Sequence, residues 1–101
     1  MKSERKLYTL YPSTLTTKKY DVWVVNPDTG RTKKVSFGAS GYEDYTTHED
    51  TERRAKYRTR HAKDKIKDPT SSGFWSWHVL WGDSTSVQTN LRAVKNMLHV
   101  N

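Results

Sequence analysis

Residues 18–38 read KKYDVWVVNPDTGRTKKVSFG, and this stretch decides the fold. The run at 20–25 is rich in β-branched and aromatic residues, which are typical of strands. The sequence NPDTG at 26–30 then supplies turn residues, and a strand-like pattern resumes after it. We therefore predict a β-hairpin over residues 19–37, with a loop of about five residues between its strands.

The spacing of residues in the second strand of this hairpin identifies one face of the strand. Lys33, Val35 and Phe37 recur at every second residue, so they share one side of a strand. Gly38 and Gly41 follow, and glycine adopts positive φ without steric cost. We expect these two glycines to close the hairpin.

Residues 1–18 are expected to form an extended N-terminal arm. Leu7, Leu10 and Leu15 lie there among Thr, Ser and Lys, a mixture that suits an arm or an edge strand better than a helix. Segments too polar to fold alone often become ordered by docking on a neighbour. Residues 19–101 are expected to form one small domain, because 101 residues suffice for one domain but not for two.

A basic helix is predicted over residues 51–66. Asp50 or Thr51 can cap its N-terminus, and the helix dipole favours Glu52 in the first turn. Its end is marked by Asp-Pro, with the proline at Pro69, because the residue before a proline disfavours helical backbone angles. Only a narrow stripe of this helix can pack, so little of it is expected to be buried.

The segment GFWSWHVLW at 73–81 is the most hydrophobic part of the chain. Its aromatic residues fit a strand at spacing two and a helix at spacings of three and four, so periodicity alone does not decide between them. Short aromatic runs bounded by glycine favour a strand. We interpret this segment as a strand or irregular aromatic segment packed on the hairpin.

A C-terminal amphipathic helix is predicted over residues 85–99. Its apolar side chains recur at spacings of four, three and four, and residues 84–86 offer a cap. The stripe consists of Val87, Leu91, Val94 and Leu98. Together these elements predict an α+β fold, in which a small antiparallel sheet is covered by one or two helices.

The composition excludes several classes of protein. Without cysteine there are no disulfides, thiolate nucleophiles or cysteine zinc sites. No apolar stretch approaches the roughly 18 residues of a membrane span, and the N-terminus lacks the apolar region of a secretory signal, so we expect a protein of the cell interior with no membrane partner. Since no Gly-x-Ser-x-Gly, P-loop or Gly-x-Gly-x-x-Gly motif is present either, we expect a non-enzymatic protein without a cofactor.

The net charge of +7 is concentrated in one segment. Residues 53–67 hold eight Lys and Arg against Asp64 alone, and an acidic run at 42–52 precedes them. Such a patch attracts polyanions, of which nucleic acid is the commonest. The alternatives are an acidic protein surface, or a solvated helix neutralised by its acidic neighbours. The candidate binding residues are Arg53, Arg54, Lys56, Arg58, Arg60, His61, Lys63, Lys65 and Lys67.

The arginines and His61 form the sharpest group within this set. An arginine holds phosphate or carboxylate through two parallel hydrogen bonds, which a lysine cannot match. Arg54 and Arg58, four residues apart, could follow a phosphate backbone along one side of a helix. Alternatively, an arginine pairs with the acids at 43–44 and stacks on a tryptophan, which would fasten the helix to the sheet.

A metal site is considered at the sequence HEDTE, residues 48–52, where His48 lies close to three acids. The spacing matches no metal motif, so no metal or catalytic residue is predicted there. A small metal-dependent nuclease using His48 remains an alternative function.

The tryptophans at 75, 77 and 81 have two interpretations. They could stack on unpaired bases, as aromatic platforms do in proteins that bind single strands. With few aliphatic residues in the chain, the core has more need of them, so we predict that they are buried.

Three features occur in a recognisable order: the strand end VSFG at 35–38, the group formed by Arg54, Arg58, Arg60 and His61, and the pair Trp75-Ser76. In these features, over residues 18–81, the chain resembles a family of small uncharacterised basic proteins encoded by large eukaryotic DNA viruses, with related forms in tailed phages. The phage forms carry cysteines at the positions of Ala62 and Trp77, so any thiolate metal site in them has no counterpart here.

The resemblance implies a viral origin and little about chemistry. We therefore expect a virion-associated structural protein, either a minor capsid or a genome-associated component, found in the virion and in the interior of the infected host cell. Its basic face would contact nucleic acid or an acidic viral protein, and residues 1–18 would contact capsid proteins. The alternative within the same resemblance is a sequence-independent nucleic-acid-binding protein that acts in the infected cell. The sequence leaves the oligomeric state open.

Overall fold

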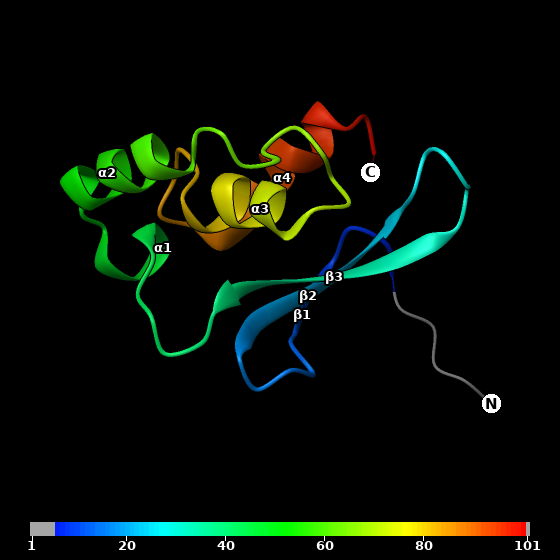
Figure 1. The fold of residues 1–101 in the computed structure, drawn as a ribbon, viewed down its shortest axis with the longest axis horizontal. Helices are drawn as coiled ribbons and strands as arrows, with labels where there is room; N and C mark the ends of the chain where they lie inside the picture. The colour runs from blue at the N-terminus through cyan, green and yellow to red at the C-terminus, as the bar shows by residue number, and fades with distance from the viewer. Residues whose placement is uncertain (1–5, 101) are drawn as a thin grey trace.

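The computed structural model describes residues 6–100, which fold as an α+β domain (Figure 1). Within this range, an antiparallel sheet has the strand order β1 (Leu10–Pro12), β2 (Lys18–Val25) and β3 (Thr32–Ala39). The helices are α1 (Tyr45–His48), α2 (Thr51–His61), α3 (Ser72–Trp75), the π-helix η1 (Ser76–Leu80) that continues α3, and α4 (Val87–Met97). The predicted fold class is confirmed.

The hairpin of β2 and β3 forms as predicted. Its register pairs Tyr20 with Phe37 and Val22 with Val35, and the loop between the strands spans residues 26–31. The side chains of Val22, Val24, Val35 and Phe37 are buried, so one face of the hairpin belongs to the core. The other side of each strand carries most of its polar residues, as the alternation of a half-buried sheet requires.

Gly38 in β3 is needed for its backbone angle and for its lack of a side chain. Gly38 has φ +81° and Gly41 has φ +85°, as expected for the two glycines that close the hairpin. A Cβ atom at Gly38 would lie 2.7 Å from the Cδ1 atom of Leu80. The glycine therefore allows η1 to approach the sheet closely.

The N-terminal segment contributes an edge strand, one of the two forms expected for residues 1–18. Leu10 lies opposite Val22 in the sheet, and the Tyr8 N–H donates to the Trp23 carbonyl at 2.9 Å. Residues 13–14 are held by the buried carboxylate of Asp21, which accepts hydrogen bonds from the Ser13 hydroxyl at 2.6 Å and the Thr14 N–H at 3.0 Å. The first five residues of the predicted arm lie outside the described part of the chain.

The aromatic segment at 73–81 is helical through Leu80, so the prediction of a strand there is wrong. Ser71 caps α3 by accepting a hydrogen bond from the Gly73 N–H at 3.1 Å. The buried side chains of α3 and η1 are Phe74, Trp75, Trp77, Val79 and Leu80. These residues project in several directions, because the segment packs on β3 and on α4 at the same time. A helix buried on several sides lacks the polar stripe that reveals an amphipathic helix in a sequence.

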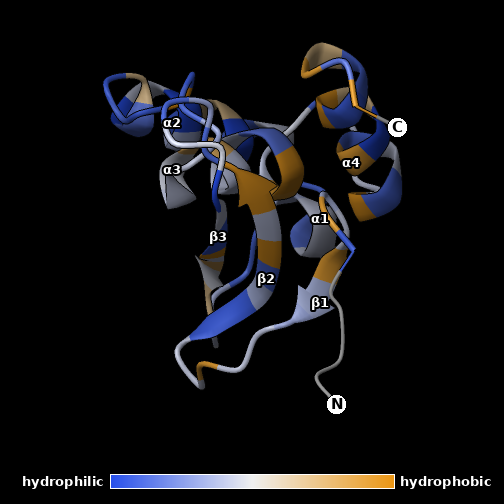
Figure 2. Cartoon of the chain, turned by 90° about the vertical axis from the view of Figure 1, so that its right-hand side faces the viewer, coloured by the Kyte–Doolittle hydropathy of each residue, from blue (hydrophilic) through white to orange (hydrophobic). Residues whose placement is uncertain are grey.

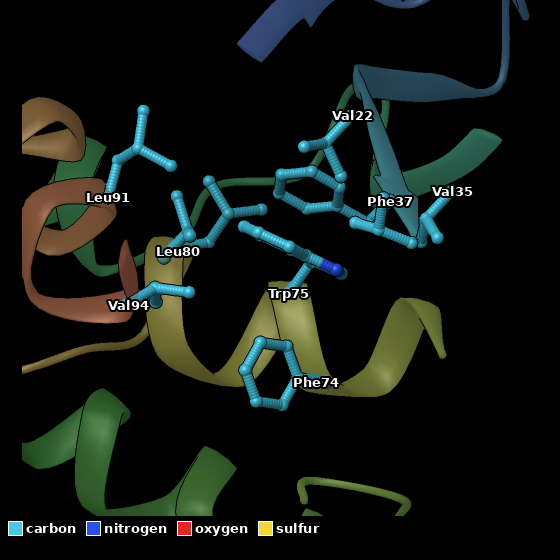
Figure 3. Packing of buried hydrophobic residues seen from close by; sticks show 10 residues of the cluster. Val22, Val35, Phe37, Phe74, Trp75, Leu80, Leu91 and Val94 are labelled. Atoms are coloured by element: carbon cyan, nitrogen blue, oxygen red, sulfur yellow. The ribbon is translucent and has the colours of Figure 1, made fainter. Parts of the chain in front are cut away.

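Trp75 is at the centre of the core (Figure 3). Its ring centroid lies 6.0 Å from that of Phe37 and 5.4 Å from that of Phe74. Its indole N–H donates to the Pro69 carbonyl at 2.8 Å, so the one polar atom of the side chain is satisfied. The tryptophan thus joins the sheet to the helical layer.

The C-terminal helix is confirmed as α4, somewhat shorter than predicted. Ser86 caps it by accepting a hydrogen bond from the Thr89 N–H at 3.2 Å, and Leu91 and Val94 are buried against Leu80 (Figure 3). The buried Asn90 donates to the carbonyls of Val79 and Ser84, each at 2.7 Å, which ties α4 to the end of η1. No helix within residues 6–100 has the length and apolar character required to cross a membrane.

The basic helix α2 begins after Asp50, as predicted, but ends at His61 instead of near residue 66. The Ile66 carbonyl accepts a hydrogen bond from the ring of His78 at 2.8 Å. To reach η1, the chain has to leave the helical path before Ile66. The proline at 69 therefore lies within the loop of residues 62–71 that joins α2 to α3.

Candidate nucleic-acid interface

Helix α2 lies at one end of the molecule, beyond the end of β3 (Figure 1), and Figure 2 colours most of it as hydrophilic. The carboxylate of Asp50 caps its N-terminus by accepting from the Glu52 N–H at 3.0 Å and the Arg53 N–H at 3.2 Å. No residue of α2 is fully buried. The helix is attached to the rest of the domain through the ends of a few long side chains.

Tyr57 is the apolar anchor of α2. Its ring stacks on Trp81 with centroids 4.2 Å apart and planes 3° apart, and on His61 with centroids 4.2 Å apart. Burial, followed by the negative charge of Asp64, raises the pKa of Tyr57 to about 12. His61 is held in place by Asp64, whose carboxylate lies 2.7 Å from the ring atom Nδ1.

Arg54 and Arg58 hold the same helix through polar contacts. Arg54 donates from Nε to the Gly82 carbonyl at 2.8 Å and pairs through Nη2 with Asp83 at 2.8 Å. Arg58 donates to the Trp81 carbonyl at 2.9 Å and lies over the ring of Trp77, 4.2 Å from its centroid. Burial, then the nearby charge of Arg54, lowers the pKa of Arg58.

The alternative prediction, that an arginine stacks on a tryptophan and pairs with the acids at 43–44, is therefore confirmed in its first part for Arg58. Its second part is wrong for Arg54 and Arg58, whose polar partners lie after η1. Asp44 is buried and paired with Lys19 of β2, not with an arginine of α2. Glu43 lies 3.7 Å from Arg53, with both side chains at least half exposed, and such a pair contributes little to stability. Arg54 and Arg58 fasten α2 to the carbonyl groups that follow η1, and not to the sheet.

Beside the stack of Tyr57 on Trp81, a cavity of about 500 Å³ lies between α2, the end of the sheet and the α3–η1 segment. We call it the basic cleft. Five cationic side chains and two carboxylates line it, so positive charge is in excess. Its lining residues are Lys18, Lys19, Gly38, Ala39, Tyr42, Glu43, Asp44, Arg53, Lys56, Tyr57, Arg60, His61, Ser72, Ser76, Leu80 and Trp81.

The cations of the basic cleft fall into two groups. Lys19 and Arg53 lie near Asp44 and Glu43, as described above. Lys18, Lys56 and Arg60 take part in no side-chain hydrogen bond or ion pair with other residues of 6–100. These three are therefore available to a ligand with negative charge.

The structure thus divides the predicted binding residues into three groups. Arg54, Arg58 and His61 form internal contacts, and Arg53, Lys56 and Arg60 line the basic cleft, where His61 also takes part in the lining. Lys63, Lys65 and Lys67 follow the end of α2 as exposed side chains outside the cleft lining.

Sequence reasoning missed Lys18, Lys19 and Tyr42, which the fold brings to the cleft from the start of β2 and the loop after β3. The two lysines could have been identified from their position at the start of the first hairpin strand, which pairs with the end of the second strand near Gly38. Strand pairing puts Lys18 opposite Ala39, next to the chain that leads to α1 and α2.

The acids near His48 do not form a metal site in the described residues. No three His, Asp or Glu side chains of residues 6–100 gather closely enough to hold a metal ion. The Nδ1 atom of His48 accepts from the Asp50 N–H at 2.9 Å, and its ring packs 5.2 Å from that of Trp81. The Nε2 atom of His48 is buried without a partner in the described residues, and a single nitrogen cannot hold a metal alone.

The tryptophans are used mainly as predicted. Trp75 and Trp77 are buried, which confirms their role in the core. Trp81 is partly buried, and it lines the basic cleft while stacking on Tyr57.

The fold and the cleft define a small α+β domain with a cationic, aromatic-lined cavity. The chain belongs to DUF5754, a family of unknown function, whose match covers residues 8–61. The match includes the sheet, α1 and α2, and so most of the cleft lining. No curated protein and no solved structure matches the chain. The family description names no source, so the viral and phage resemblance stays a prediction.

Proposed function

We propose that the protein is a non-enzymatic nucleic-acid-binding protein whose basic cleft takes the phosphate backbone without reading sequence. The observation that carries this proposal is the position of Lys18, Lys56 and Arg60. Lys18 begins β2, and the other two lie one turn apart on α2. All three line one cavity and have no carboxylate partner in the described chain. Cations assembled in this way attract a polyanion, because the two carboxylates of the cleft, Glu43 and Asp44, lie against Arg53 and Lys19 instead.

This arrangement of cations fits nucleic acid better than it fits an acidic protein surface. A phosphate backbone presents charges at regular, close intervals, so one strand can meet several of these cations at once. The exposed lysines 63, 65 and 67 extend the same positive region beyond the end of α2. An acidic protein surface remains the second ligand class, and competition by polyglutamate would reveal it.

The test is fluorescence anisotropy with labelled DNA of about 20 nucleotides, single-stranded and duplex, over a range of salt concentrations. With about three phosphates contacted, log affinity should fall against log salt with a slope of about 2–3. Changing both Lys18→Gln and Lys56→Gln should reduce the slope by about 1.4 for a single strand. The matched control is Arg92→Gln with Lys95→Gln on α4, which removes the same charge outside the cleft. Absence of binding at low salt, or equal loss in both double variants, would overturn the proposal.

We further propose that the nucleic acid is a packaged viral genome and that residues 1–18 contact capsid proteins. This rests on the resemblance to virus-encoded proteins, and the position of β1 at the edge of the described sheet supports it, since edge strands are sites of pairing with other chains. Mass spectrometry of purified particles tests it. Detection in infected-cell lysate but never in particles would contradict virion association and leave the alternative of a nucleic-acid-binding protein in the infected cell.

A further inference from the structure

Tyr42 is the most exposed of the large hydrophobic side chains in the described residues, at 74%. It lies in the loop that joins β3 to α1, directly after Gly41, whose φ of +85° turns the chain there. Its ring takes part in none of the aromatic stacks described above. A single exposed ring is ordinary on a protein surface, so what Tyr42 can do depends on the side chains around it.

This tyrosine is also part of the lining of the basic cleft, together with Lys18, Lys56 and Arg60. An aromatic ring beside cations that have no internal partner is the combination by which proteins hold single strands. The cations take the phosphates, and the ring stacks on a base.

We propose that the ligand of the cleft is single-stranded nucleic acid and that Tyr42 stacks on one of its bases. This proposal rests on the proposed function and specifies the form of nucleic acid. In a duplex the bases are paired and stacked on each other, so a duplex could offer its phosphates to the cations but no base face to Tyr42. The cavity of about 500 Å³ has the size of a site for a small molecule, which suits one nucleotide of a strand.

Three ligands of equal length separate phosphate binding from base stacking: an oligothymidine strand, the same strand without its bases, and a duplex. Fluorescence anisotropy at one low salt concentration measures the affinity for each. Stacking is worth about 1–3 kcal/mol per base, which corresponds to a factor of about 5 to 150 in affinity. We expect oligothymidine to bind more tightly than the strand without bases by a factor in this range, and more tightly than the duplex.

Variants at Tyr42 complete the test. Tyr42→Ala should weaken oligothymidine binding about 5- to 150-fold and leave binding of the strand without bases unchanged, whereas Tyr42→Phe should keep the wild-type affinity. Met97→Ala on α4, another exposed apolar side chain, is the control and should change neither affinity. Circular dichroism checks that each variant is folded.

The outcomes distinguish this inference from the proposed function. If none of the three ligands binds the wild-type protein, both fail. If all three bind equally and Tyr42→Ala has no effect, phosphate binding stands and base stacking is wrong. Tighter binding of duplex than of oligothymidine also overturns the inference.

Discussion

Arg58 and Arg60 are two residues apart on α2 and have opposite surroundings. Arg58 donates to a carbonyl group and lies on a tryptophan, whereas Arg60 is exposed, lines the basic cleft and has no carboxylate partner in the described chain. Two residues along a helix correspond to about 200° around its axis, so neighbours of this kind face opposite sides. The comparison teaches that a run of like charges on one helix can contain two functions, attachment and binding, which only the fold separates.

The largest expected effect is a loss of stability on removing a contact that attaches α2 to the rest of the domain. Tyr57→Ala removes the ring that stacks on both Trp81 and His61, and should lower the free energy of unfolding by about 2–3 kcal/mol. The matched control is Tyr42→Ala, which should stay within about 0.5 kcal/mol of wild type because that ring is exposed. Urea denaturation measures both. Equal losses for the two tyrosines would contradict the role of Tyr57 as the anchor of α2.

The next effect separates the two arginines directly. Arg58→Gln should lower the free energy of unfolding by about 1.5–2 kcal/mol, because it removes a charged donor to the Trp81 carbonyl and a cation from the ring of Trp77. The same denaturation experiment on Arg60→Gln should show a change below about 0.5 kcal/mol. An Arg58→Gln variant as stable as wild type would show that the contact is not an attachment.

A pH experiment tests the role of Tyr57 in attaching α2. The pKa of Tyr57 is raised above its ordinary value of 10.0 to about 12, so the neutral ring stabilises the fold fully below pH 10. That contribution is lost as the pH rises from about 10 through 12. Tyr57→Phe keeps the stack and has no group to ionise. Thermal unfolding should give equal midpoints at pH 8 and a lower midpoint for wild type at pH 11; parallel curves for both proteins would contradict the assignment.

The smallest expected effect is on the salt dependence of nucleic-acid binding. Arg60→Gln should reduce the slope of log affinity against log salt by about 0.7 for a single strand, because one phosphate contact is lost. Arg92→Gln on α4 should leave the slope unchanged. A slope that is identical in Arg60→Gln and wild type would exclude Arg60 from the interface.

The parts of the fold that local chemistry specifies could be predicted from the sequence. The hairpin was identifiable because its strands alternate around a turn, and α4 because its apolar residues form one stripe. The helix α3–η1 could not be identified from its pattern, since its side chains are buried in several directions. The end of α2 lies before the predicted one, in a segment where the Ile66 carbonyl is held by the ring of His78, and a contact between residues 12 apart leaves no local pattern in the sequence.

The candidate site could be predicted only in part, for a related reason. The charge of residues 53–67 located the basic helix, but the same composition is compatible with attachment and with binding. The different roles of Arg58 and Arg60 depend on which side of α2 packs against Trp77 and Trp81. The local sequence pattern of the helix does not indicate that side. The contribution of Lys18 depends on strand pairing that brings residue 18 to the end of the sheet beside α1 and α2.

Lysine footprinting tests the central claim most directly. The protein is treated with an amine-acylating reagent with and without a bound oligonucleotide, and mass spectrometry measures the rate of modification at each lysine. Our account predicts that Lys18 and Lys56, which line the basic cleft, are protected together, while Lys95 on α4 reacts at the same rate in both samples. Protection of Lys95 to the same extent as Lys18 and Lys56, or unchanged rates at the two cleft lysines while the oligonucleotide is bound, would contradict it.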